Sequence, residues 1–238
     1  MNYNIMWPGG PTFVHDEASF RPGTDSILLA WFAAGGPVKR ACDLGCGTGV
    51  ISLIMAWQDD ALTVDGVEIQ PEWTALAREN LKLCSLDDRV TIIDGDLRRH
   101  REFLEAGAYD LVVANPPYYA LGSGKSAPEE SRAKAREERE STLADIAAAA
   151  AYLTRWGGRF ALVHKPERLA EVIRTLSEKG LEPKRLRFVQ YRHDSAPNLV
   201  LIESRRGGNP SLTVEPPLIL TDSAGNDTEE VKRIYHRE

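Results

Sequence analysis

The tetrapeptide Asn115-Pro116-Pro117-Tyr118 combines residue types that can hold and activate an amino nitrogen. An amino group conjugated to a ring or a carbonyl is a poor nucleophile, because its lone pair is delocalised. The side-chain oxygen of Asn115 and the carbonyl oxygen of Pro116 can each accept one N–H bond, which would direct the nitrogen lone pair toward an electrophile. Two prolines stiffen the loop, and Tyr118 offers a face for stacking a planar base or amide. We predict catalysis of group transfer to nitrogen; a purely structural Pro-Pro turn is the alternative.

A glycine-rich loop, Asp43-Leu44-Gly45-Cys46-Gly47-Thr48-Gly49, lies between a short apolar run and an apolar segment that starts at Val50. Glycines there bring backbone amides close to a ligand at a helix N-terminus. Glu68 ends the next apolar run, where a carboxylate can accept hydrogen bonds from ribose hydroxyls. Asp43 would attract a cationic amino group and repel a pyrophosphate. The signs of these charges predict S-adenosylmethionine as the cofactor in preference to NAD; the alternative is a glycine turn without a ligand.

Asp94-Gly95-Asp96-Leu97 follows the third apolar run. The Asp96 side chain would lie at the carboxyl edge of a sheet, where it could accept a hydrogen bond from an adenine amino group. Capping of a following helix is the alternative for Asp96. The predicted cofactor site comprises Asp43, Gly45, Cys46, Gly47, Thr48, Gly49, Glu68, Ile69, Asp96, Leu97 and Asn115.

These motifs follow short apolar runs that alternate with amphipathic segments, which is typical of a parallel sheet with crossover helices. The predicted strands are residues 41–44, 63–68, 90–93, 109–114 and 159–163, and the predicted helices are 50–57, 72–83 and 143–153. Segments 187–191 and 199–203 are too close together for a helical crossover and predict an antiparallel hairpin. We expect an α/β fold: the Rossmann-like, doubly wound class I methyltransferase sheet, mostly parallel with a C-terminal antiparallel hairpin.

The composition limits the classes of protein to consider. The 238 residues carry a net charge of −6, so no global basic field indicates a nucleic-acid partner. We find neither a signal peptide nor an apolar stretch long enough to span a bilayer. The three cysteines, Cys42, Cys46 and Cys84, form no disulfide framework and lack a second Cys/His pair for a metal. We expect a soluble cytoplasmic protein without a metal.

The glycine loop and the Asn-Pro-Pro-Tyr tetrapeptide together resemble the amino-methyltransferases that act on adenine, guanine or glutamine nitrogen. Residues 23–30, 135–138 and 228–235 further resemble the tRNA1(Val) (adenine(37)-N6)-methyltransferase family, whose members methylate adenine beside the anticodon. This resemblance covers roughly residues 20–235. It implies an N-terminal segment (1–37) that caps the cofactor pocket, with Thr24 and Asp25 near its mouth, followed by a methyltransferase domain (38–238).

Two groups of basic residues are candidates for contacts to RNA phosphates. Lys125, Arg132 and Arg136 follow the tetrapeptide, and Arg185, Arg187 and Arg192 lie around the predicted hairpin. If these residues converge on one face, they could bind phosphates; scattered solvated charges balanced by nearby glutamates are the alternative. A target base would be splayed out of an RNA loop to reach Tyr118.

The resulting hypothesis is an S-adenosylmethionine-dependent methyltransferase that acts on the N6 amino group of adenine in structured RNA, with tRNA as the first candidate. Ribosomal RNA and a protein glutamine side chain are the alternative substrates. A catalytically inactive RNA-binding scaffold is the alternative of a different class. We expect a monomer or weak homodimer and no membrane partner.

Overall fold

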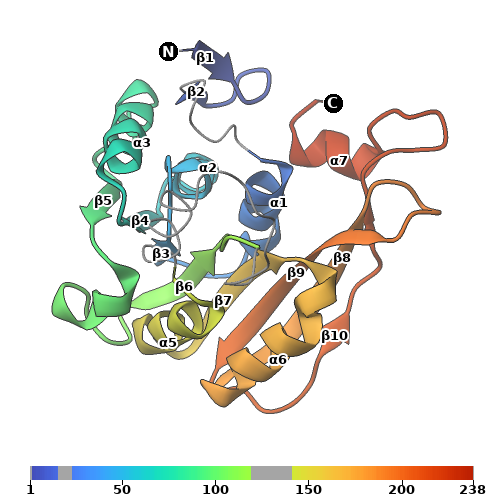
Figure 1. Cartoon of the computed structure of the whole chain (residues 1–238). Helices are drawn as coiled ribbons and strands as arrows, with labels where there is room; N and C mark the ends of the chain where they lie inside the picture. The colour runs from blue at the N-terminus through green and yellow to red at the C-terminus, as the bar shows by residue number, and fades with distance from the viewer. Residues whose placement is uncertain (1, 16–22, 119–140, 238) are drawn as a thin grey trace, which may run out of the picture.

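The computed structural model describes residues 2–15, 23–118 and 141–237. The described strands form one two-stranded hairpin and one nine-stranded sheet (Figure 1). The large sheet has the order β10-β8-β9-β7-β6-β3-β4-β5, and β11 also pairs with β8. The fold class predicted from the sequence is confirmed.

The parallel half of the sheet holds the strands that precede the sequence motifs. It comprises β3 (Arg40–Leu44), β4 (Thr63–Glu68), β5 (Val90–Asp94), β6 (Tyr109–Ala114) and β7 (Thr154–His164). The predicted helices appear as α2 (Val50–Gln58), α3 (Pro71–Leu83) and α5 (Leu143–Leu153). The carboxyl ends of the parallel strands meet at one edge, which is where such sheets bind ligands.

The C-terminal hairpin extends the sheet in antiparallel pairing. β8 (Leu181–Gln190) pairs with β9 (Pro197–Arg206), and β9 also pairs with β7. Both strands are longer than predicted, because pairing with neighbours holds residues in the extended conformation beyond the apolar segments. Two short strands that the sequence analysis missed, β10 (Thr213–Val214) and β11 (Leu218–Ile219), add to β8 in parallel.

Apolar side chains alternate between two core layers, one on each face of the sheet. Along β6, Leu111 and Val113 pack with α1 (Thr24–Ala33), α2, α3 and α7 (Glu229–Ile234). Val112 and Ala114 face the layer that contains α5 and α6 (Leu169–Glu178). Figure 1 shows these helix groups on opposite sides of the sheet. Short 3-10 turns, η1 (Leu97–Glu102) and η2 (Pro166–Arg168), follow β5 and β7. Every helix in the described ranges is too short or too polar to cross a membrane.

The N-terminal hairpin, β1 (Asn2–Ile5) and β2 (Thr12–His15), is fixed to α3 and reaches the glycine-rich loop through one asparagine. The Val14 amide donates to Asn80 Oδ1 at 2.7 Å, and Asn80 Nδ2 donates to the Thr48 carbonyl at 3.1 Å. Nearby, Trp7 stacks against His236 and meets Trp57 edge-on, with ring centroids 5.1 and 5.5 Å apart. The two ends of the described chain therefore meet beside α2.

Two of the arginines predicted to contact RNA point into the protein. Arg187 is only 8% exposed; its guanidinium donates to both carboxylate oxygens of Glu230, at 2.7 and 2.8 Å, and to the Pro216 carbonyl. Arg185 donates to the Phe32 carbonyl and forms ion pairs with Glu203 and Glu215. These contacts weigh against the predicted RNA role of Arg185 and Arg187, because their charges are balanced by carboxylates and Arg187 is buried. We therefore do not include them in an RNA-binding surface.

Arg187→Ala should lower the free energy of unfolding by about 2–4 kcal/mol, because it leaves Glu230 without its partner and opens the contact between β8 and α7. Arg192→Ala is the matched control: it breaks an exposed pair with Asp194 and should cost less than about 1 kcal/mol. Urea denaturation followed by tryptophan fluorescence measures both. Equal small losses would show that the Arg187 pair contributes no more than a surface ion pair.

Candidate active site

A cavity of about 370 Å³ lies at the carboxyl edge of the sheet, which is within the ~300–1,000 Å³ range typical of small-molecule sites. Its wall comes from the loops after β3, β4, β5 and β6, together with the first turns of α1 and α5. The residues are Asp25, Ser26, Leu44, Gly45, Cys46, Gly47, Thr48, Val50, Ile51, Val67, Glu68, Ile69, Gln70, Trp73, Gly95, Asp96, Leu97, Asn115, Pro116, Pro117, Tyr118, Ser141 and Ile146. The glycine-rich loop and the Asn-Pro-Pro-Tyr tetrapeptide therefore line the same cavity.

The glycine-rich loop turns sharply from β3 into α2. Gly45, Gly47 and Gly49 have φ angles of 70°, 55° and 82°, in the left-handed region that disfavours residues with a side chain. At Gly49 a Cβ atom would also lie 3.1 Å from the Ala77 Cβ, so α2 and α3 pack closely at this point. Gly49 is thus the N-cap that aims α2, behind the cavity wall rather than in it.

The Glu68 carboxylate holds the loops after β3 and β4 together. Oε2 accepts from the Gly47 amide, and Oε1 accepts from the amides of Ile69 and Gln70, all at 2.9 Å. These bonds use three of the roughly four acceptor positions of a carboxylate, and the Gln70 side chain donates to Glu68 as well. Burial raises the pKa of Glu68, and the backbone hydrogen bonds from Gln70, Gly47 and Ile69 oppose that rise.

Asp43 lies beneath the glycine-rich loop and does not form part of the cavity wall. Its side chain is fully buried, and its Oδ2 accepts from the Ser52 amide at 3.2 Å and from the Ser52 hydroxyl at 2.8 Å. Within the described part of the chain, its Oδ1 has no hydrogen-bond partner. Burial raises the pKa of Asp43 to about 7, against the lowering effect of the Ser52 hydrogen bonds. Direct contact with a cofactor amino group stays a prediction for this residue.

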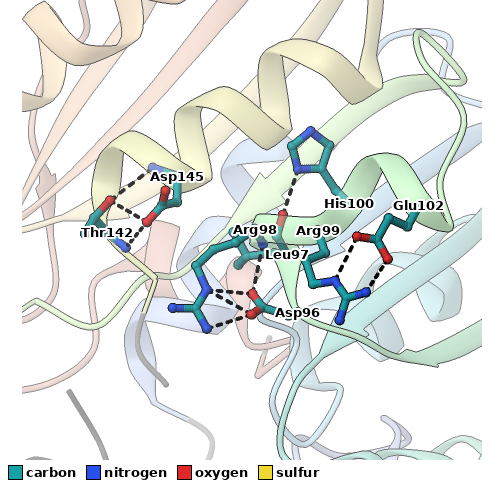
Figure 2. Close-up of polar contacts among 8 residues, drawn as sticks. All are labelled: Asp96, Leu97, Arg98, Arg99, His100, Glu102, Thr142 and Asp145. Atoms are coloured by element: carbon teal, nitrogen blue, oxygen red, sulfur yellow. Dashed lines mark hydrogen bonds and ion pairs between the residues drawn. The ribbon is translucent and has the colours of Figure 1, made fainter. Parts of the chain in front are cut away.

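Asp96 performs the capping role that the sequence analysis kept as the alternative. Its Oδ1 accepts from the Arg98 amide at 2.9 Å, and its two carboxylate oxygens also pair with the Arg98 guanidinium (Figure 2). This arrangement lowers the pKa of Asp96, chiefly through the Arg98 side chain. Asp96 also lines the cavity. A contact with adenine stays a prediction, and it would have to share this carboxylate with Arg98.

The start of α5 forms the part of the cavity wall that contains Ile146. Thr142 and Asp145 form a capping box, in which Asp145 Oδ2 accepts from the Thr142 amide at 2.9 Å and the Thr142 hydroxyl accepts from the Asp145 amide at 3.2 Å (Figure 2). Ile146 follows in the same turn and lines the cavity with Leu97. The sequence pattern did not single out Ile146, because its apolar position in α5 reads equally well as a core residue.

Trp73 is a further wall residue that the sequence analysis missed. It lies in the first turn of α3, and a Cβ atom at Gly47 would come within 3.8 Å of its ring. The neighbouring Thr74, Leu76 and Ala77 are buried, whereas Trp73 is half-buried. Its signal in the sequence was a large aromatic residue just after Glu68.

Asn115 and Tyr118, from the loop after β6, form hydrogen bonds with the first turn of α1. Asn115 Nδ2 donates to Ser26 Oγ at 2.9 Å, and the Tyr118 hydroxyl lies 2.5 Å from Asp25 Oδ2 and 3.0 Å from Asn115 Oδ1. Burial raises the pKa of Tyr118, and the nearby Asp25 raises it further. The tetrapeptide therefore carries no charge, and Ser26 and Asp25 of α1 hold it at Asn115 and at Tyr118.

The Tyr118 ring is flanked by the end of β7 and the residue that follows it. The His164 ring meets it edge-on at 5.7 Å, and the Lys165 ammonium lies over it at 5.0 Å from the ring centre. Lys165 also donates to the Asn198 carbonyl at 3.3 Å, in the β8–β9 hairpin. Tyr118 thus lies between the cavity and this hairpin.

The remaining predicted residues fall into three groups. Thr24 is exposed and forms a hydrogen bond with Tyr235, outside the cavity wall. Arg192 is exposed and pairs with Asp194 at 3.3 Å. Lys125, Arg132 and Arg136 lie outside the described residues, as does the 135–138 segment. In the ranges that the structure describes, no group of three or more His, Cys, Asp or Glu residues could hold a metal ion.

Asp43→Asn should change how stability depends on pH. A carboxyl group with a folded-state pKa of about 7, above its ordinary 3.8, stabilises the folded protein when protonated. That stability is lost as pH rises from about 4 to about 7, with a slope of up to about 1.4 kcal/mol per pH unit. The difference in unfolding free energy, variant minus wild type, should therefore grow from pH 5 to pH 7 and then level off.

Urea denaturation at pH 5, 6, 7 and 8 measures this difference. Asp88→Asn, at an exposed position, controls for the loss of one negative charge. A difference for Asp43→Asn that stays constant across the range would show that Asp43 ionises as an ordinary surface carboxylate.

Comparisons with known proteins agree with this geometry. The family model for the methyltransferase small domain matches residues 14–178. A protein of Tolumonas auensis named tRNA1(Val) (adenine(37)-N6)-methyltransferase is 30% identical over 209 residues, which is 87% of this chain and 85% of that protein. A protein of the same name from Escherichia coli O9:H4 is 34% identical over 121 residues, covering 50% of this chain and 49% of that protein.

Solved structures show the same fold at lower sequence identity. A crystal structure from Agrobacterium tumefaciens, described as that of a predicted O-methyltransferase, has a TM-score of 0.74 at 20% identity and covers 90% of this chain and 96% of that one. A geranyl diphosphate methyltransferase solved in complex with SAM has a TM-score of 0.56 at 16% identity, covering 76% and 84%. The match to residues 14–178 and the extent of the Tolumonas relative confirm the resemblance, and the chain belongs to the methyltransferase small domain family.

Proposed function

We propose that this protein is an S-adenosylmethionine-dependent methyltransferase that acts on the N6 amino group of adenine in tRNA, near the anticodon. The observation that carries the proposal is the shared cavity, which places the Asn115–Tyr118 tetrapeptide beside the glycine-rich loop and Glu68. The names of the Tolumonas and Escherichia relatives support adenine N6 and tRNA as the target. A tRNA substrate also fits the expected cytoplasmic location.

The donor set of the cavity suits S-adenosylmethionine. Glu68 would accept from a ribose hydroxyl in place of the Gln70 side chain, and the backbone of the glycine-rich loop leaves space where a side chain would intrude. Apolar wall residues, among them Val67, Leu97 and Ile146, suit the flat adenine ring. Asp25 in the wall has the sign that favours a cationic amino group, and Asp43 beneath the loop would add to it only when its carboxyl group, with a pKa raised to about 7, is ionised. When bound there, the cofactor supplies an electrophilic methyl group.

The tetrapeptide would hold the target nitrogen for an in-line attack. Asn115 Oδ1 and the Pro116 carbonyl each accept one N–H of the amino group, which keeps its lone pair directed at the methyl carbon. Pro116 is buried and Pro117 follows it, so the loop is stiff. No strong base is needed, because the proton can leave after the nitrogen has become cationic. The Tyr118 ring would support the base by stacking.

The RNA would approach over the β8–β9 hairpin. Lys165 contacts both the hairpin, through the Asn198 carbonyl, and the Tyr118 ring. Arg192 is exposed in the turn of the hairpin, next to Tyr191, which is 59% exposed. A cation beside an exposed aromatic ring suits phosphate contact with base stacking. These residues lie at the carboxyl edge of the sheet, because β8 runs parallel to β7 through their shared partner β9.

A methyl-transfer assay with labelled S-adenosylmethionine tests the reaction and the substrate together. The acceptors are bulk tRNA and ribosomal RNA from cells that lack this gene, and a protein fraction, followed by mass spectrometry of nucleosides and amino acids. We expect N6-methyladenosine in tRNA. Label in ribosomal RNA, in guanine or in protein glutamine would keep the fold and cofactor but overturn the substrate; no label and no binding of S-adenosylmethionine in calorimetry would support the scaffold alternative.

Asn115→Ala should lower kcat for methyl transfer by about 100-fold or more, because the amide acceptor acts on the reacting nitrogen. Affinity for S-adenosylmethionine should stay within about threefold, as measured by calorimetry. Asn209→Ala, an exposed asparagine outside the cavity wall, is the control and should behave as wild type. A parallel loss of cofactor affinity in Asn115→Ala would show that Asn115 serves the cofactor rather than the target.

Lys165→Ala and Arg192→Ala should each weaken tRNA binding and reduce the slope of log affinity against log salt by about one unit. Arg155→Ala is the matched control: Arg155 is exposed and paired with Asp110, but it lies at the opposite end of β7. Filter binding at several salt concentrations measures the slopes. Equal slopes in all three variants would place the RNA on another face.

A further inference from the structure

The catalytic loop is held by two neighbouring residues of α1, which lie about 90 positions earlier in the chain. Asn115 Nδ2 donates to Ser26 Oγ at 2.9 Å across a separation of 89 residues. The Tyr118 hydroxyl contacts Asp25 Oδ2 at 2.5 Å across a separation of 93 residues. Ser26 is buried at 7% exposure, and all four residues line the cavity.

The Tyr118 hydroxyl has one proton and two acceptors within reach. It lies 2.5 Å from a carboxylate oxygen of Asp25 and 3.0 Å from Asn115 Oδ1. A carboxylate is the stronger acceptor, and hydrogen bonds to charged groups are shorter and stronger than those to neutral amides. The shorter distance to Asp25 agrees with this preference. Donation to Asp25 is therefore favoured, and a hydroxyl that donates there does not also donate to the Asn115 oxygen.

That oxygen is the one the target amino group needs. A tyrosine hydroxyl donating to Asn115 Oδ1 would take the place of the target N–H and compete with it. Ser26 acts on the other end of the same amide, since its hydroxyl accepts from Nδ2 and so leaves Oδ1 on the opposite side.

We propose that Asp25 and Ser26 are positioning residues for methyl transfer: Asp25 draws the Tyr118 hydroxyl away from Asn115 Oδ1, and Ser26 holds the Asn115 amide so that this oxygen faces the target amino group. The inference rests on the proposed transfer to nitrogen. It assigns a role in the reaction to residues that touch Asn115 and Tyr118 rather than the reacting atoms.

A purely structural role is the competing explanation for Asp25. Its Oδ1 accepts from the Ser26 amide at 3.0 Å, and an acidic residue in the first turn stabilises a helix N-terminus. Both roles predict that replacing Asp25 is harmful. They differ in what happens when the Tyr118 hydroxyl is removed as well.

The first experiment compares Asp25→Asn, Tyr118→Phe and the double variant, with bulk tRNA from cells lacking this gene as acceptor. Asp25→Asn should lower kcat/KM about tenfold, or about 1.4 kcal/mol, because the amide is a weaker acceptor than the carboxylate and the Tyr118 hydroxyl can then donate to Asn115 instead. Tyr118→Phe serves as the reference for the double variant, because it removes the hydroxyl and keeps the ring. In the Tyr118→Phe background, Asp25→Asn should lower kcat/KM less than about threefold, because no hydroxyl then competes for Asn115. A tenfold loss from Asp25→Asn in the Tyr118→Phe background as well, with a lowered Tm in both Asp25 variants, would overturn the proposal.

The second experiment does not depend on activity. The side-chain amide resonances of Asn115, assigned by their loss in Asn115→Asp, should exchange slowly with water in the wild type. Ser26→Ala should speed this exchange about tenfold or more and lower kcat, while Ser26→Thr, which keeps a hydroxyl, should restore both. Unchanged exchange in Ser26→Ala overturns the role of Ser26. Failure of the wild type to methylate any nitrogen overturns the proposed function, whereas wild-type methylation without rescue or exchange effects overturns only the positioning roles.

Discussion

The hydrogen bonds of Glu68 hold together the loops that form the cofactor end of the cavity. Its carboxylate accepts from the amides of Gly47, Ile69 and Gln70, and its backbone carbonyl accepts from the Gly95 amide at 2.9 Å. One residue at the end of β4 thus joins the loops after three adjacent strands. A buried carboxylate is costly unless its acceptor positions are filled, and here the backbone of the loops fills most of them. Loop geometry and carboxylate charge therefore stabilise each other.

Acidic side chains near this edge have different surroundings and hence different properties. Asp43 is fully buried and accepts from Ser52 alone among the described residues, so its pKa rises to about 7. Asp96 pairs with Arg98, which lowers its pKa. Asp25 is partly exposed and accepts a hydrogen bond from the Tyr118 hydroxyl. Burial and the available donors, more than residue type, decide which carboxylate is charged and which can meet a ligand.

The arginines follow the same rule. Arg185 and Arg187 look in the sequence like part of a basic cluster, yet their guanidinium groups fasten β8 to α1 and α7 through Phe32 and Glu230. Arg192, beyond the end of β8, stays exposed. In a chain with a net charge of −6, Arg185 and Arg187 have their charges balanced by glutamates of the same protein.

The sequence by itself determined the alternating α/β order, the antiparallel hairpin, the glycine-rich loop and the position of the tetrapeptide after β6. These features depend on apolar periodicity and on backbone preferences of glycine and proline, which act over a few residues. It did not reveal β10 and β11, because two-residue strands carry no periodicity and form only where β8 offers a free edge.

Only the tertiary structure decided which polar side chains meet. Ser26 and Asp25 reach Asn115 and Tyr118 because α1 packs against β7 and β9, next to the loop after β6, and nothing in the local sequence of α1 encodes that contact. Partners about 90 residues apart are set by the packing of whole elements, whereas local spacing fixes only the elements themselves.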